Sequence, residues 1–126
     1  MRICLVSDGK DLSTPLASTF ERCPYFMIVN LDQEEMVTSF LNDAQTAPRG
    51  AEIQTAQLLV DHRVEIVITP QIGINALNVL QIAGIRIYLG NSGTLQENID
   101  AYCQGKLVET KMAIHLSEPK MGSCMS

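Results

Sequence analysis

The sequence predicts one α/β domain built on a mixed β-sheet with flanking helices. In the second half, short β-branched segments alternate with amphipathic helical segments, which is typical of parallel strands joined by helical crossovers. In the first half, two apolar segments are separated by only four polar residues, which favours an antiparallel hairpin. A chain of 126 residues that is 46% hydrophobic is large enough to form one core.

The first half contains three expected strands and one long loop. Residues 2–7 are apolar on both faces, as in a buried strand. The loop at 11–24 holds two prolines, and loops of this length in a compact domain are often functional. Strands follow at 25–31 and 36–41, joined by a turn at 32–35.

The second half contains three expected helices and two expected strands. The helices are expected at 50–62, 74–83 and 95–102, and the strands at 64–69 and 85–89. Gly84 is a plausible end for the second helix, and Thr94 with Glu97 forms a capping box for the third. Residues 107–116 are ambiguous and form an edge strand or none. The prediction is one domain over 1–116 and a flexible tail over 117–126.

Charge and cysteine spacing exclude several kinds of protein. A net charge of −5 without a cluster of Lys or Arg argues against nucleic acid as a partner. No apolar segment approaches the roughly 20 residues of a membrane span. No targeting segment is evident, so the cytoplasm is the expected location. The cysteines at 4, 23, 103 and 124 lack the spacing of a zinc or ferredoxin-type motif and are expected to be free thiols.

Ligands of such sheets bind outside the carboxyl ends of the parallel strands. Three loops are expected to meet there, at 7–9, 69–75 and 90–94, and two of them lead into helix N-termini that attract anions. The same glycine-rich turns are also explained by the fold alone. Nucleotide-binding and hydrolase motifs are absent, and His62 and His115 lie away from this edge. The sequence therefore predicts a protein that is not an enzyme.

Cys23 is the one cysteine with a plausible chemical role. It follows Arg22 at the end of the long loop, and a nearby guanidinium lowers the pKa of a thiol and favours binding of a soft metal. An ordinary loop cysteine is an equally good interpretation.

Five short motifs, in the same order, resemble the dinitrogenase iron–molybdenum cofactor biosynthesis family. They are the strand at 2–7, the segment Phe20-Glu21-Arg22-Cys23-Pro24-Tyr25-Phe26, the helix start Gly50-Ala51-Glu52-Ile53-Gln54, the turn Ile72-Gly73-Ile74-Asn75-Ala76 and the segment Ala83-Gly84-Ile85-Arg86-Ile87-Tyr88. The segment at 20–26 is similar to the family's Phe-Gly-Arg-x-Pro-Tyr-Phe pattern. The resemblance extends over roughly residues 1–105.

The resemblance implies a fold and a role. The family fold is ribonuclease H-like, with three layers, α/β/α, around a five-stranded mixed sheet. Its members bind iron–sulfur or iron–molybdenum cofactors or their precursors, have no known enzymatic activity, and work with cofactor-assembly proteins. The alternative is a metal-free interaction or regulatory domain that partners an iron–sulfur assembly protein or an ATPase.

The resemblance also implies a site between the loop at 11–24 and the helix starts at Gly50 and Gly73. The implied cofactor-binding residues are Arg22, Cys23, Arg49, Gly50, Gly73 and Asn75, with Cys23 as the metal ligand. Thr19 and Arg49 occupy positions where the family pattern often has histidine.

Overall fold

The computed structural model describes residues 1–31, 36–42 and 50–112. Its elements are β1 (Arg2–Ser7), β2 (Tyr25–Asn30), β3 (Met36–Leu41), α1 (Ala51–Asp61), β4 (Ile66–Thr69), α2 (Ile74–Ile82), β5 (Arg86–Leu89), α3 (Leu95–Cys103) and β6 (Val108–Thr110). Each helix and strand expected in the two halves lies within two residues of its predicted ends. The predicted turn at 32–35, the domain boundary at 116 and the tail fall outside the described residues.

The described strands form one mixed sheet in the order β3-β2-β1-β4-β5-β6. The three central strands β1, β4 and β5 are parallel, whereas β2, β3 and β6 add antiparallel neighbours. The expectation of five strands is wrong, because β6 pairs with β5 as a sixth. In β6, Val108 is 66% exposed and only Thr110 is buried. This strand therefore lacks the alternation of buried apolar and exposed polar residues by which a strand is predicted from sequence.

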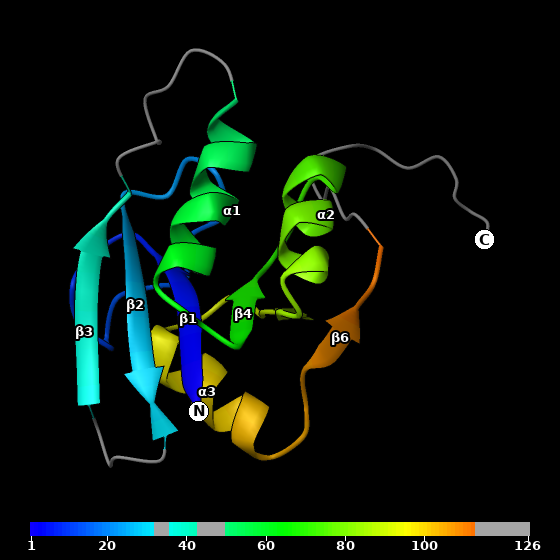
Figure 1. Cartoon of the computed structure of the whole chain (residues 1–126). Helices are drawn as coiled ribbons and strands as arrows, with labels where there is room; N and C mark the ends of the chain where they lie inside the picture. Colours follow the sequence, from blue (N-terminus) through cyan, green and yellow to red (C-terminus); the bar gives the residue numbers. More distant parts are fainter. Residues whose placement is uncertain (32–35, 43–49, 113–126) are drawn as a thin grey trace, which may run out of the picture.

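Helices cover both faces of the sheet. The helices α1 and α2 pack side by side on one face, and α3 lies on the opposite face (Figure 1). β1 is central, and Ile3, Cys4, Leu5 and Val6 are completely buried because both of its faces are covered. No described helix is long and apolar enough to cross a membrane. The ribonuclease H-like classification stays a prediction.

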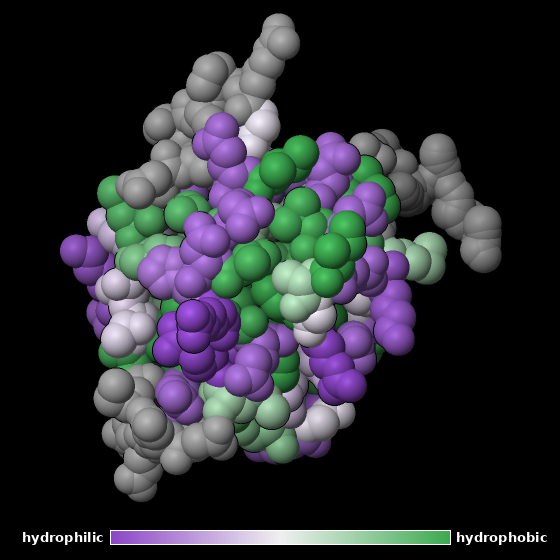
Figure 2. Space-filling model, in the orientation of Figure 1, coloured by the Kyte–Doolittle hydropathy of each residue, from purple (hydrophilic) through white to green (hydrophobic). Residues whose placement is uncertain are grey.

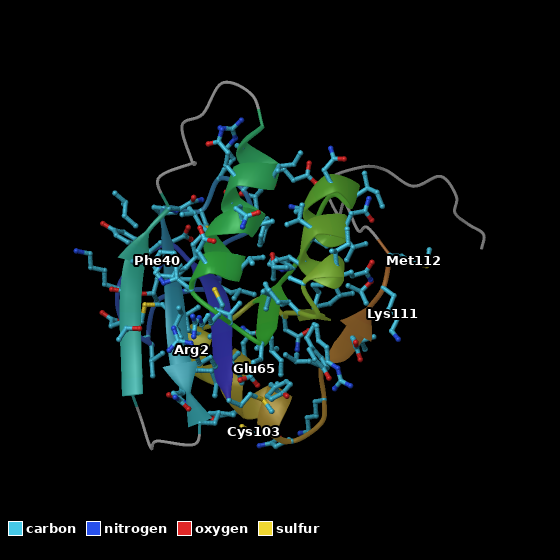
Figure 3. All side chains as sticks on the ribbon, in the orientation of Figure 1. Arg2, Phe40, Glu65, Cys103, Lys111 and Met112 are labelled. Atoms are coloured by element: carbon cyan, nitrogen blue, oxygen red, sulfur yellow. The ribbon has the colours of Figure 1, made fainter. Side chains whose placement is uncertain are left out.

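The end of α1 is fixed to the sheet by aromatic and charged contacts. The ring of His62, which follows α1, stacks on Phe40 of β3 with 3.8 Å between ring centroids. The guanidinium of Arg2 donates to the His62 carbonyl from Nε and Nη2, at 3.2 and 2.9 Å. Arg2 and Phe40 can be located in Figure 3. His62 therefore serves the packing of α1 onto the sheet.

A buried polar pair fixes the start of α1 against the long loop. Asn42 donates from Nδ2 to the carbonyls of Glu21 and Cys23, at 3.2 and 2.9 Å. Thr55 Oγ1 donates to Asn42 Oδ1 at 3.3 Å, and both side chains are completely buried. The end of β3, the start of α1 and the loop at 21–23 are thereby held together at the carboxyl edge of β1.

Candidate functional site

A cleft of about 710 Å³ opens at the carboxyl ends of β4 and β5. Three short segments line it, at 16–19, 70–71 and 90–92: Leu16, Ala17, Ser18, Thr19, Pro70, Gln71, Gly90, Asn91 and Ser92. Two of the three loops predicted to meet at this edge do so. The third wall comes from the long loop at 11–24 and not from residues 7–9, because Leu16 pairs with Ser7 at the end of β1.

Backbone hydrogen bonds fix the wall formed by residues 16–19. The Leu16 amide donates to the Gly93 carbonyl at 2.8 Å, and the Ala17 amide donates to Val6 at 3.1 Å. Pro15 also forms an isolated bridge with Thr94. The long loop is thus attached both to β1 and to the start of α3, which places Thr19 in the cleft.

Asn98 fixes the wall formed by residues 90–92. This side chain is 1% exposed and comes from the buried face of α3. Its Oδ1 accepts from the Asn91 amide at 2.8 Å, and its Nδ2 donates to the carbonyls of Asn91 and Thr94 at 3.0 and 2.9 Å. Asn98 is not among the site residues predicted from the sequence. The available signal was an Asn at a position of the helix where an apolar side chain is expected.

Gly90 lies in the lining of the cleft, in close contact with residues of the long loop, α3 and β4. A Cβ atom there would collide with Leu16 Cδ2 and would lie 3.0 Å from Asn98 Oδ1 and Ile68 Cγ2. This glycine is needed because β5 ends against the long loop and α3, and its role is one of close packing.

The helix N-termini predicted to attract anions use acceptors from the chain itself. In α3 the amides of Leu95 and Gln96 donate to the carbonyls of Thr14 and Leu12, and Glu97 donates to Thr94 Oγ1 in the predicted capping box. The first three amides of α3 are therefore satisfied internally.

At α2 the internal acceptor is Glu52 of the neighbouring helix α1. Its Oε2 accepts from the Ala76 amide at 3.0 Å, and its carboxylate lies where a side chain at Gly73 would project. An anion at the start of α2 would have to displace this carboxylate. The N-termini of α2 and α3 are therefore explained by the needs of the fold, without an anionic ligand.

The residues implied by the family resemblance meet at a second, smaller hollow of about 250 Å³. Arg22, Gly50 and Asn75 line it, together with Glu21, Ala51, Glu52 and Ile53. Gly73 lies beside it, under the carboxylate of Glu52. Arg49 is outside the described residues. We call this the small hollow.

Cys23 is 2% exposed and its Sγ donates to the Phe20 carbonyl at 3.4 Å. Burial raises the pKa of this thiol to about 12, and the Asp8 carboxylate also raises it. The expectation that Arg22 lowers this pKa is wrong, because desolvation of the thiolate dominates. The buried thiol lines neither the cleft nor the small hollow. The role of Cys23 as a metal ligand stays a prediction.

The other described cysteines lie away from both cavities. Cys4 is completely buried within β1, and burial raises the pKa of its thiol. Cys103 is exposed and lies at the end of α3, far from the carboxyl ends of the parallel strands β1 and β4 (Figure 3). Among the described residues, no three His, Cys, Asp or Glu side chains are grouped so that they could hold a metal ion.

The mixed sheet and the uncharged cleft define a small α/β domain with a cavity of ligand size at the carboxyl edge. The family described as "Dinitrogenase iron-molybdenum cofactor" matches residues 1–105. The chain belongs to this family, which confirms the resemblance and connects the protein with cofactor handling.

Known relatives agree with this assignment. Protein MJ0580 of Methanocaldococcus jannaschii is 31% identical over 109 residues, which cover 85% of this chain and 89% of that protein. The solved structure of TM1290 from Thermotoga is 33% identical with a TM-score of 0.79, and covers 90% of this chain and 97% of that one. The apo form of the orange protein from Desulfovibrio gigas shares the fold, with a TM-score of 0.86 at 23% identity over 90% of this chain and 96% of that one.

Proposed function

We propose that this protein is a non-enzymatic binding or carrier protein for an iron–sulfur or iron–molybdenum type cofactor, or for a precursor of one. The cleft at the ends of β4 and β5 is the binding site in this proposal. Its volume of about 710 Å³ lies within the range of roughly 300–1,000 Å³ typical of small-molecule sites. Family membership supports this class of ligand, and the volume and position of the cleft support this location.

The lining of the cleft supports a particular way of binding. None of its described residues is a carboxylate, a cation, a thiol or an imidazole. Ser18, Thr19 and Ser92 offer hydroxyl groups, and Gln71 and Asn91 offer amides. This set fits a cofactor that keeps its own ligands and is held by hydrogen bonds and apolar contact. It does not fit a metal that the protein must coordinate directly.

The same lining supports a role without catalysis. A general acid or base needs a titratable group within hydrogen-bond reach of the reacting atom, and the described lining offers none. A bound cofactor would leave by breaking hydrogen bonds rather than by exchanging protein ligands, which suits a carrier that must both hold and release.

Anaerobic incubation with two probes tests the proposal. Tetrathiomolybdate is a mononuclear molybdenum–sulfur anion, and a synthetic thiolate-ligated four-iron cluster represents the iron–sulfur class. We expect colour and metal to remain with the protein after gel filtration. Wild-type protein that elutes colourless and free of iron and molybdenum would refute the proposal.

Two variants locate the binding site. Ser92→Trp fills the cleft from an exposed position and is expected to abolish retention of both probes. Arg22→Gln alters the small hollow and is expected to leave retention unchanged. The reverse result would move the proposed site to the small hollow that the family motifs imply.

An alternative function is a metal-free interaction or regulatory domain that partners an iron–sulfur assembly protein or an ATPase. The solvent-facing surface of α2 favours it. All five exposed residues of this helix are uncharged: Ile74, Asn75, Asn78, Gln81 and Ile82. Figure 2 shows apolar side chains gathered over α1 and α2 on this face, where Ile53, Ile74 and Ile82 are 47%, 53% and 88% exposed. Depletion of charge is a feature of interface centres.

Ile82→Lys tests this alternative in a co-purification with the candidate partner. We expect wild-type protein to be retained by the immobilised assembly protein and the variant to be lost. Equal retention of the two proteins, or retention of neither, would contradict this second function.

A further inference from the structure

Gln71 connects two walls of the cleft. Its Nε2 donates to the Ser18 carbonyl at 2.7 Å, across a sequence separation of 53 residues. Both residues line the cleft, and the bond lies on its solvent-exposed side. The bond therefore joins the segment that follows β4 to the long loop at the mouth of the cleft.

Each end of this connection is anchored in the core. On one side the buried Thr69 donates from Oγ1 to the Gln71 carbonyl at 2.9 Å, which orients the residue at the end of β4. On the other side Ser18 is exposed between the buried Ala17 and Phe20. Ser18 is thus an exposed residue next to a part of the wall that is bonded to β1 through Ala17.

We propose that Gln71 is a positioning residue that sets the width of the cleft mouth and thereby governs release of the bound cofactor. The inference rests on the proposed function of the cleft. An exposed hydrogen bond between neutral groups is weak in net terms, because water replaces it readily. Such a connection opens without a large barrier, which is what a carrier needs. We expect release of a polynuclear cluster to depend on this bond more than release of a smaller mononuclear anion.

Gln71→Met is the sharpest variant, because methionine has a similar length but has no donor at its end. We expect release of the four-iron cluster to become roughly 3- to 10-fold faster, as the loss of the hydrogen bond to Ser18 implies. Release of tetrathiomolybdate should change less. Stopped-flow dilution into excess unlabelled apoprotein measures both rates.

Two further variants separate a positioning role from a purely structural one. Gln57→Met removes an exposed glutamine, whose Nε2 donates to Asp61 at 3.3 Å on α1, and should leave both release rates unchanged. Gln71→Lys restores a donor and should return the release of the four-iron cluster toward the wild-type rate in high salt. The thermal midpoints of Gln71→Met and Gln57→Met should agree.

Failure of this inference and failure of the proposed function give different results. Equal release rates in wild type and Gln71→Met, or equal acceleration in Gln57→Met, overturn the role of Gln71 and leave the carrier function standing. If wild-type protein retains neither probe, the carrier function falls, and with it the control of release. Hydrogen exchange of the amides at 16–19 then decides whether Gln71 sets the mouth, and exchange that is no faster in Gln71→Met overturns that part too.

Discussion

Two cavities lie at the carboxyl edge of the sheet, and they differ in what the chain has already placed inside them. The cleft is lined by apolar, hydroxyl and amide groups, none of them charged among the described residues. The small hollow is lined by Glu21, Arg22 and Glu52, and the carboxylate of Glu52 accepts the Ala76 amide at the start of α2. The cleft is the larger cavity and offers neutral polar groups, whereas in the small hollow a carboxylate of the chain already accepts the helix amide.

The difference between the cavities shows that a family motif does not by itself indicate whether its residues are open to a ligand. Arg22, Gly50 and Asn75 do come together, as the family motifs imply. An arginine, a glycine and a helix start are attractive to an anion only where the chain supplies no anion of its own. Here Glu52 supplies one, and the site that we propose is the larger cleft at the ends of β4 and β5.

The largest expected effect comes from Asn98→Ala, which breaks the cleft and leaves the small hollow intact. Its loss removes three hydrogen bonds and leaves the Asn91 amide and two carbonyls without these partners. Each buried unsatisfied group costs about 1–3 kcal/mol, so we expect the free energy of unfolding to fall by about 3 kcal/mol. Urea unfolding measures this loss, and probe retention in the cleft should fall with it.

Gln96→Ala is the matched control on the same helix. Its side chain is exposed and donates only to Asp100, at 3.0 Å. We expect a change within about 0.5 kcal/mol and unchanged retention of the probes. Equal stability of the two variants would show that Asn98 does not hold the cleft wall.

A smaller effect is expected at alkaline pH, from the buried thiol of Cys23 near the end of the long loop. The folded state raises the pKa of Cys23 to about 12 from a value of 9.0. Above pH 9 the unfolded chain loses this proton while the folded protein keeps it, so the free energy of unfolding falls as pH rises through this window. The slope approaches about 1.4 kcal/mol per pH unit for one such group.

Unfolding by urea at several pH values from 8 to 11 measures this slope. Cys23→Ala should have a shallower slope than wild type, and Cys103→Ala is the control for removal of an exposed thiol. A Cys23→Ala curve parallel to that of wild type would show that the thiol titrates normally. Burial of Cys23 would then not dominate the pKa of its thiol.

Much of the fold was predictable because each element carries its own local signal. The β-branched segment of β4 and the capping box of Thr94 and Glu97 both specify structure within a few residues. β6 was not predictable in this way. It is three residues long, and its pairing with β5 depends on Leu89 and Ile87, which are separated from it by a whole helix.

The site was predictable only to the level of the sheet edge. Strand order determines that the loops after β4 and β5 are neighbours, and they do line one cleft. The choice between the two cavities depends on the contacts of Gln71 with Ser18 and of Glu52 with Ala76, across 53 and 24 residues. Neither contact has a signature in the local pattern. Asn98 differs, because a polar residue between the buried Leu95 and Ile99 of α3 is a signal that the sequence itself contains.

The smallest expected effect concerns Glu52, and it tests the difference between the cleft and the small hollow most directly. Glu52→Gln keeps an oxygen that can accept from the Ala76 amide and removes only the charge at the start of α2. An acidic side chain at a helix N-terminus contributes about 0.3–1 kcal/mol, so we expect a loss of about 0.5 kcal/mol in the free energy of unfolding. Retention of both probes in the cleft should not change.

Glu97→Gln is the matched variant at α3, where the carboxylate accepts from the Thr94 amide at 2.8 Å. It should cost a similar amount, because both carboxylates serve the N-terminus of a helix. If Glu52→Gln instead leaves stability unchanged and improves retention of tetrathiomolybdate, the carboxylate competes with the ligand rather than completing the helix. The small hollow would then be the binding site, and the Glu52 carboxylate would inhibit binding there.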